Sequence, residues 1–182
     1  MTKPITSAQL FFLYDNHCPW TYAATPLINE ITQAFPNIEL HLWHAAFFDG
    51  NSGSDINSKK EELEQVKKLA SISFSSAYQE TLKQNTNSTL SANLMTWAQN
   101  KTPSLALSLL NALQEEHFEQ GNTLAKASDF DGVITALKIS PPAKVFKDKL
   151  NKDTLMQLEE IFSLQEIIAT EAIPALLLAI DD

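Results

Sequence analysis

The sequence predicts an α/β fold in which one strand–helix–strand unit is followed by a long helical segment. The aromatic-rich apolar run over residues 10–14 is typical of a short buried strand. The apolar residues after it recur at three- and four-residue steps, as on one face of a helix. A second strand is expected over residues 39–45, so this is a βαβ unit with a right-handed crossover. From residue 58 onward the apolar spacing is mostly helical. The last predicted helix carries apolar residues expected in the core: Leu155, Leu158, Ile161, Phe162, Ile167 and Ile168.

Length and composition indicate one domain, or one domain with a large insert, because the chain has 182 residues of which 44% are hydrophobic. The net charge is −9 and there is no arginine, so nucleic acid is not expected as a partner. The longest apolar stretch, residues 172–180, has nine residues and contains a proline, so no membrane span is expected. The first seven residues do not have the pattern of a secretory signal, which predicts a cytoplasmic location.

The only cysteine, Cys18, directly precedes Pro19 between the first strand and the helix. Proline is favoured at the first helical position, which places Cys18 at a helix N-terminus where negative charge is stabilised. We therefore expect a thiol with a lowered pKa that acts as a nucleophile. The alternative is a buried structural cysteine. One cysteine cannot form an internal disulfide. Of the four histidines only His41 and His44 come near ligand spacing, and in a strand their side chains point to opposite faces, so no metal site is expected.

The strand, the sequence Cys18-Pro19-Trp20-Thr21 and the following helix resemble the active site of the thioredoxin superfamily. Ile173-Pro174, followed by an apolar run, looks like the cis-proline strand that lies beside the active cysteine in that superfamily. Cys18 and Pro174 are much farther apart in the chain than in thioredoxins. This spacing resembles the DsbA-like group, which includes FrnE-type disulfide oxidoreductases, 2-hydroxychromene-2-carboxylate isomerases and kappa-class glutathione transferases. Two further segments are similar to that group: residues 87–98 and 117–122.

The resemblance implies a thioredoxin-like fold, with its βαβ unit and cis-proline strand, and a large all-helical insertion. The thioredoxin-like domain would comprise residues 1–48 and 141–182, and the insertion residues 49–140. In that fold another strand and a closing helix follow the cis-proline strand. The sequence ends at Asp182, so we expect either that these two elements are missing or that the sheet edge is covered in another way. An exposed apolar edge strand invites pairing, so a homodimer is also expected.

The resemblance also implies a DsbA/FrnE-like thiol–disulfide oxidoreductase or isomerase with Cys18 as nucleophile. Thr21 stands where a dithiol enzyme has its resolving cysteine. A mixed disulfide on Cys18 would therefore need a small thiol such as glutathione to resolve it. The Thr21 hydroxyl could donate a hydrogen bond to the sulfur anion, or simply be polar in the first turn. His17 could stabilise the thiolate or transfer protons, or be a solvated loop residue.

The expected partner is a thiol or disulfide substrate, with no tightly bound cofactor and glutathione as the candidate small thiol. Pro19 and Trp20 would flank the site, with Trp20 as an apolar platform. The backbone of Ile173, before Pro174, would pair with an extended substrate. Two alternatives remain open. One is a glutathione-dependent transferase or isomerase in which the group at position 18 activates the glutathione thiol. The other is a redox-inactive peptide-binding module.

Overall fold

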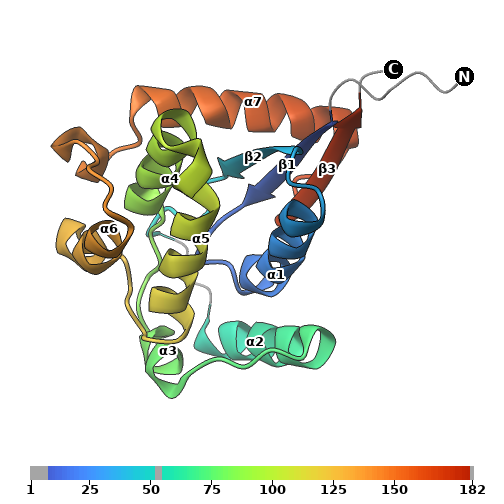
Figure 1. The fold of residues 1–182 in the computed structure, drawn as a ribbon. Helices are drawn as coiled ribbons and strands as arrows, with labels where there is room; N and C mark the ends of the chain where they lie inside the picture. The colour runs from blue at the N-terminus through green and yellow to red at the C-terminus, as the bar shows by residue number, and fades with distance from the viewer. Residues whose placement is uncertain (1–7, 52–54, 181–182) are drawn as a thin grey trace, which may run out of the picture.

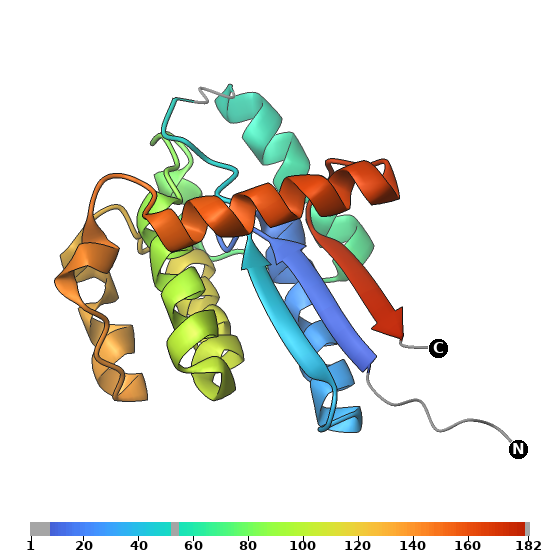
Figure 2. The same cartoon turned by 90° about the horizontal axis from the view of Figure 1, so that it is seen from above.

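The computed structural model describes residues 8–51 and 55–180. Its three-stranded mixed sheet has the order β2-β1-β3, and β1 lies between its neighbours in both views (Figures 1 and 2). β1 is parallel to β2 and antiparallel to β3, with Leu13 opposite both Trp43 and Ala175. The predicted βαβ unit is confirmed. The strands are β1 (Ala8–Tyr14), β2 (Glu39–His44) and β3 (Ala175–Ile180).

Two helices cover the two faces of the sheet (Figures 1 and 2). α1 (Pro19–Ala34) lies on one face and α7 (Lys152–Ile168) crosses the other. Successive residues of β1 serve the two faces, because side chains alternate along a strand. Phe12 packs with Ile28 of α1, whereas Leu13 packs with residues of α7.

Among the described residues, five further α-helices and two short 3₁₀ helices lie between β2 and α7 in the chain, as the helical spacing predicted. The last three α-helices share a core with the sheet, because one buried cluster contains Phe12 and Leu42 together with Leu94 and Leu110. The first two α-helices form a separate cluster that packs against Trp20 and Tyr22 of α1. The division of the chain into residues 49–140 and the remainder stays a prediction. The α-helices are α2 (Ile56–Ala70), α3 (Ser76–Thr81), α4 (Thr89–Lys101), α5 (Pro103–Phe118) and α6 (Asp131–Leu137).

A glycine after α5 allows α3 to pack against the end of that helix. Gly121 has a φ of +71°, which favours glycine over other residues. A Cβ at this position would lie 2.7 Å from the backbone carbonyl carbon of Ala77 in α3. This close approach brings Tyr78 beside His117 of α5, with ring centroids 5.1 Å apart.

The prediction for the apolar residues of α7 is wrong for half of them. Leu158 and Ile161 are buried, but Leu155, Phe162 and Ile167 are 48%, 60% and 79% exposed. α7 is covered where it meets the described three-stranded sheet and α4, and apolar residues on its other faces remain in solvent. Elsewhere, the Ile173–Pro174 peptide bond before β3 is cis, as the resemblance implied.

Candidate active site

Cys18 occupies the predicted place at the N-terminus of α1. It is the N-cap residue, with Pro19 as the first helical residue. Its N–H donates to the Asp15 carbonyl and its carbonyl accepts from the N–H of Tyr22, both at 3.0 Å. β1 runs toward Cys18, and Leu13 near its end lies opposite Ala175, the first residue of β3. Pro174, which precedes Ala175, therefore lies at the same end of the sheet as Cys18.

The expected lowering of the Cys18 pKa is wrong. The residue is only 6% exposed, and burial raises the pKa of the thiol to about 11. The backbone N–H and hydroxyl of Thr21 and the N–H of Trp20 lower this pKa, while the Asp15 carboxylate raises it. Loss of solvent outweighs the favourable helix N-terminus, so Cys18 is a protonated thiol at neutral pH.

Thr21 lies in the first turn of α1 and is fully buried. Its hydroxyl faces the sulfur closely enough to lower the Cys18 pKa. The hydroxyl nevertheless has no partner at ordinary hydrogen-bond geometry among the described residues. Because an unsatisfied buried hydroxyl is unfavourable, Thr21 is available to bind a sulfur anion or a substrate atom.

Asp15, at the end of β1, is a fully buried carboxylate that organises the loop before α1. Its Oδ1 accepts from the backbone N–H of His17 at 2.9 Å and faces His17 Nδ1 at 3.3 Å. Its Oδ2 accepts from the Phe47 N–H at 2.9 Å and the Ser88 hydroxyl at 2.6 Å. Burial alone would raise the pKa of Asp15, but the nearby His44 and His17 and these hydrogen bonds hold it well below its usual range.

His17 is buried rather than solvated, with only 2% of its surface exposed. Its Nδ1 faces Asp15, whereas its Nε2 is buried and has no hydrogen-bond partner in the described structure. The ring lies edge-to-face against His117, with centroids 4.7 Å apart. His17 therefore has one nitrogen oriented by a carboxylate and one nitrogen free to react.

A third histidine supports the loop from β2. His44 is fully buried, and burial lowers its pKa to about 4, so the imidazole is neutral at neutral pH. Its Nδ1 accepts from the Ala46 N–H at 3.0 Å. Nε2 therefore carries the proton and donates to the side-chain oxygen of Asn16 at 2.6 Å.

A small cavity of about 50 Å³ is lined by His17 and Pro19, the two neighbours of Cys18 in the chain, and by Tyr78 and His117. Lys59 of α2 also lines it, but its ammonium group donates to the carbonyls of Leu82 and Gln84. The predicted platform residue Trp20 is half-buried and packs against a cluster from the helical segment: Leu63, Val66, Phe74, Tyr78, Leu82 and Phe118.

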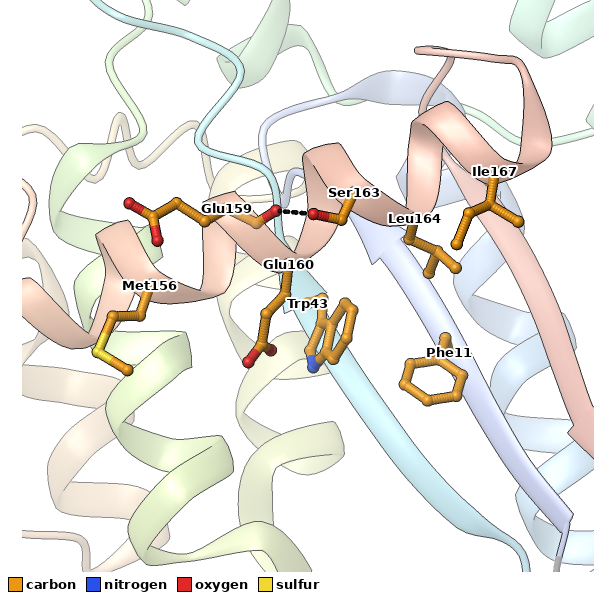
Figure 3. Close-up of a pocket in the computed structure, with 8 residues that line it drawn as sticks. All are labelled: Phe11, Trp43, Met156, Glu159, Glu160, Ser163, Leu164 and Ile167. Atoms are coloured by element: carbon orange, nitrogen blue, oxygen red, sulfur yellow. Dashed lines mark hydrogen bonds between the residues drawn. The ribbon is translucent and has the colours of Figure 1, made fainter.

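Larger hollows lie away from Cys18. A groove of about 440 Å³ runs between α7 and the sheet, where Figure 3 shows the carboxylate of Glu160 beside the Trp43 indole. It contains no cysteine or histidine, so nucleophilic chemistry is better supported at Cys18. Within residues 8–51 and 55–180, no group of three His, Cys, Asp or Glu side chains could hold a metal ion. No helix in the same part of the chain is long and apolar enough to cross a membrane.

Residues 9–161 match the family described as DSBA-like thioredoxin domain. The chain belongs to this family. No curated protein sequence matches the chain. The cytosolic disulfide reductase DsbM from Pseudomonas aeruginosa, solved with GSH (glutathione), has 17% identity and a TM-score of 0.79. The match covers 96% of this chain and 89% of DsbM.

Two other solved structures have the same fold at low identity. A putative protein disulfide isomerase from Nitrosomonas europaea has 14% identity and a TM-score of 0.74, over 95% of this chain and 85% of its own. A 2-hydroxychromene-2-carboxylate isomerase has 14% identity and a TM-score of 0.59, over 94% and 85%. The thioredoxin-like DsbA fold and the family resemblance are therefore confirmed.

Sequence reasoning missed four residues of the site, namely Asp15, Tyr78, Ser88 and His117. Asp15 could have been noticed, because it directly follows the buried strand and lies two residues before His17. The other three lie far along the chain, and only tertiary packing brings them to the loop. The predicted roles of Cys18, Thr21, His17, Pro19, Trp20, Ile173 and Pro174 stay predictions.

Proposed function

We propose that the protein is a monothiol thiol–disulfide oxidoreductase or isomerase that reacts through Cys18. The position of the lone thiol carries this proposal. Cys18 is the N-cap of α1, at the end of the sheet where β3 begins, in a chain of the DSBA-like family. The cytoplasm, where thiols are kept reduced, is the location we propose.

The proposed reaction proceeds by thiol–disulfide exchange. Cys18 loses its proton and attacks one sulfur of a substrate disulfide, which forms a mixed disulfide and breaks the substrate S–S bond. The second substrate sulfur leaves as a thiolate and takes up a proton. A small thiol such as glutathione then attacks the substrate sulfur of the mixed disulfide, which forms a disulfide between the two and releases Cys18, and Cys18 takes up the proton of the small thiol. The DsbM structure that contains glutathione supports this choice of thiol.

The other predicted residues have roles in binding. Thr21 would donate its free hydroxyl to the sulfur anion, and the backbone of Ile173 would pair with an extended substrate. Trp20 and Pro19 would border the bound peptide. The cavity of about 50 Å³ next to His17 and Pro19 is too small for glutathione, so the substrate would bind outside it.

The test is formation of a mixed disulfide with oxidised glutathione, followed by intact-mass analysis of the folded protein. We expect one glutathionyl group on the wild type, none on Cys18→Ser, and release of the group by reduced glutathione. Thr21→Cys is the matched variant, because a thiol at this position should convert the adduct into an internal disulfide. If the folded wild type forms no adduct while the urea-unfolded chain does, the proposal is wrong.

A glutathione-dependent transferase or isomerase is the second candidate. The raised Cys18 pKa and the unpartnered Thr21 hydroxyl favour it, because such an enzyme needs no thiolate of its own. The fold is also that of a 2-hydroxychromene-2-carboxylate isomerase. Conjugation or isomerase activity that survives in Cys18→Ser would support this candidate over covalent catalysis. The third candidate, a redox-inactive module, would bind extended peptides without forming an adduct.

A further inference from the structure

We propose that His17 is the base that accepts the Cys18 proton, and that His117 and Tyr78 are positioning residues that hold the proton path beside it. This inference rests on the proposed thiol–disulfide exchange and goes beyond it, because it assigns residues of the helical segment to the reaction. His17, His117 and Tyr78 line one small cavity that also touches Pro19, on the other side of the only thiol, and His17 Nε2 is buried without a partner.

The first of these groups is His17 Nε2, which is buried and unpartnered in the described structure. Native proteins rarely leave a buried polar atom unsatisfied unless function requires it. The Asp15 carboxylate faces Nδ1 at 3.3 Å and therefore fixes the N–H on that nitrogen. Nε2 then carries a lone pair, and the buried carboxylate would stabilise the imidazolium that forms when Nε2 takes a proton.

The second group is His117 of α5, whose Nδ1 lies 2.7 Å from the carbonyl oxygen of Asn122. A carbonyl only accepts, so Nδ1 is the protonated nitrogen and Nε2 is an acceptor. Burial, together with the nearby His17, lowers the pKa of His117 to about 3. His117 therefore stays neutral while His17 is charged, which avoids two positive charges on rings in edge-to-face contact.

The third group is Tyr78 of α3, which is only 5% exposed and lines the same cavity. Its pKa is raised by burial and by the charges of Glu62 and Cys18, so it remains a hydrogen-bond donor. Tyr78 belongs to the apolar cluster against which Trp20, two residues after Cys18, packs. Other charged groups facing the cavity are Glu62 and Lys59 of α2.

The cavity provides the remaining part of the path. Its volume of about 50 Å³ suffices for a water molecule, which needs two to four polar partners. His117 Nε2 and the Tyr78 hydroxyl can supply those partners. The Cys18 proton moves through this water to His17 Nε2 as the sulfur bonds to the substrate. The imidazolium then returns the proton to the leaving thiolate, so the exchange needs no added oxidant or reductant.

The test is the rate of Cys18 glutathionylation by oxidised glutathione, measured between about pH 5 and pH 9. We expect His17→Asn to slow the reaction at neutral pH by about tenfold or more, as is usual for loss of a general base. His117→Asn keeps a donor near Nδ1 but removes Nε2. It should slow the reaction severalfold and shift the midpoint of its pH profile. His117→Gln, which places an amide near Nε2, should restore part of the rate.

Two controls separate this inference from the proposed function and from misfolding. His41→Asn alters a histidine that stacks on Phe11 away from the cavity, and should leave rate and profile unchanged. Tyr78→Phe keeps the ring, and should slow the reaction severalfold even if the His117 variants fail to fold. If the wild type forms no adduct, the proposed function fails. If it forms the adduct and the folded His117→Asn and Tyr78→Phe variants match its rate and profile, this inference is overturned while the function stands.

Discussion

At the scale of single residues, the loop before α1 depends on Asp15. This carboxylate accepts hydrogen bonds from a neighbour in the loop, from the chain after β2 and from Ser88 at the start of α4. It therefore ties three segments together beneath Cys18. Its depressed pKa means that it stays ionised while fully buried, which is tolerated because its acceptor positions are filled.

Asp15→Asn should destabilise the protein by about 2–4 kcal/mol, because an amide presents an N–H group where the carboxylate oxygen accepted hydrogen bonds. Urea unfolding at neutral pH measures the change in the free energy of unfolding. Glu39→Gln alters an exposed acid and should change it by about 0.5 kcal/mol or less. Equal stability of Asp15→Asn and wild type would contradict the role assigned to Asp15.

The placement of Cys18 and Pro19 was predictable because a helix N-terminus is set by local sequence. The state of the thiol was not, since it depends on how completely other residues exclude water. Tyr78 and His117 come from α3 and α5, and their approach to the loop depends on a glycine at position 121. No sequence pattern near Cys18 indicates that Tyr78 and His117 lie close to this loop.

At the scale of elements, β1, β2 and the start of α1 were predicted to within two residues, because periodicity and proline positions are local signals. The burial of α7 was less predictable. Its apolar residues point in several directions, and the width of the sheet beneath decides which are covered. The apolar pattern of α7 alone does not predict how wide the sheet beneath it is.

Substitutions in α7 should separate its covered and uncovered residues. Ile161→Ala should cost about 2–4 kcal/mol, because Ile161 is buried against the sheet. Phe162→Gln, at the next position, should change the free energy of unfolding by about 0.5 kcal/mol or less, because Phe162 is 60% exposed. Urea unfolding of the two variants is the measurement. A similar loss in both would mean that a further surface covers Phe162.

At the scale of the whole molecule, two neutral buried histidines link folding to pH. Burial lowers the pKa of His44 to about 4 and of His117 to about 3, whereas an unfolded chain has histidine pKa values of about 6.5. Below about pH 6.5 these two histidines are therefore protonated in the unfolded state but stay neutral in the folded state. Their contribution to stability is complete above that pH and is lost as pH falls toward the folded values.

The free energy of unfolding should fall by several kcal/mol between about pH 7 and pH 4.5. The slope of this free energy against pH should approach the value for two protons taken up on unfolding. Urea unfolding at a series of pH values gives that slope. His117→Asn removes one of the two groups, so the slope should drop by about one proton. A stability that is constant over this range would show that these histidines are accessible to protons in the folded state.

Self-association also belongs to this scale, and the homodimer stays a prediction. β3 is an edge strand of the described sheet, and its residues Leu178 and Ile180 are about half exposed. Such an apolar edge can pair with another chain. The sequence indicated this edge through its apolar run, but the partner of an edge strand is not encoded in the strand itself.

The burial of the only thiol has a kinetic consequence. Cys18 is only 6% exposed, so the rate at which a reagent modifies it in the native protein depends on how often local motion exposes the sulfur, as well as on the loss of its proton. This is the logic of hydrogen exchange applied to a sulfur atom. Because there is no second cysteine, the signal comes from one known site. The reactivity of Cys18 therefore indicates how often the native protein opens locally, and substrates that favour the open state should increase the modification rate.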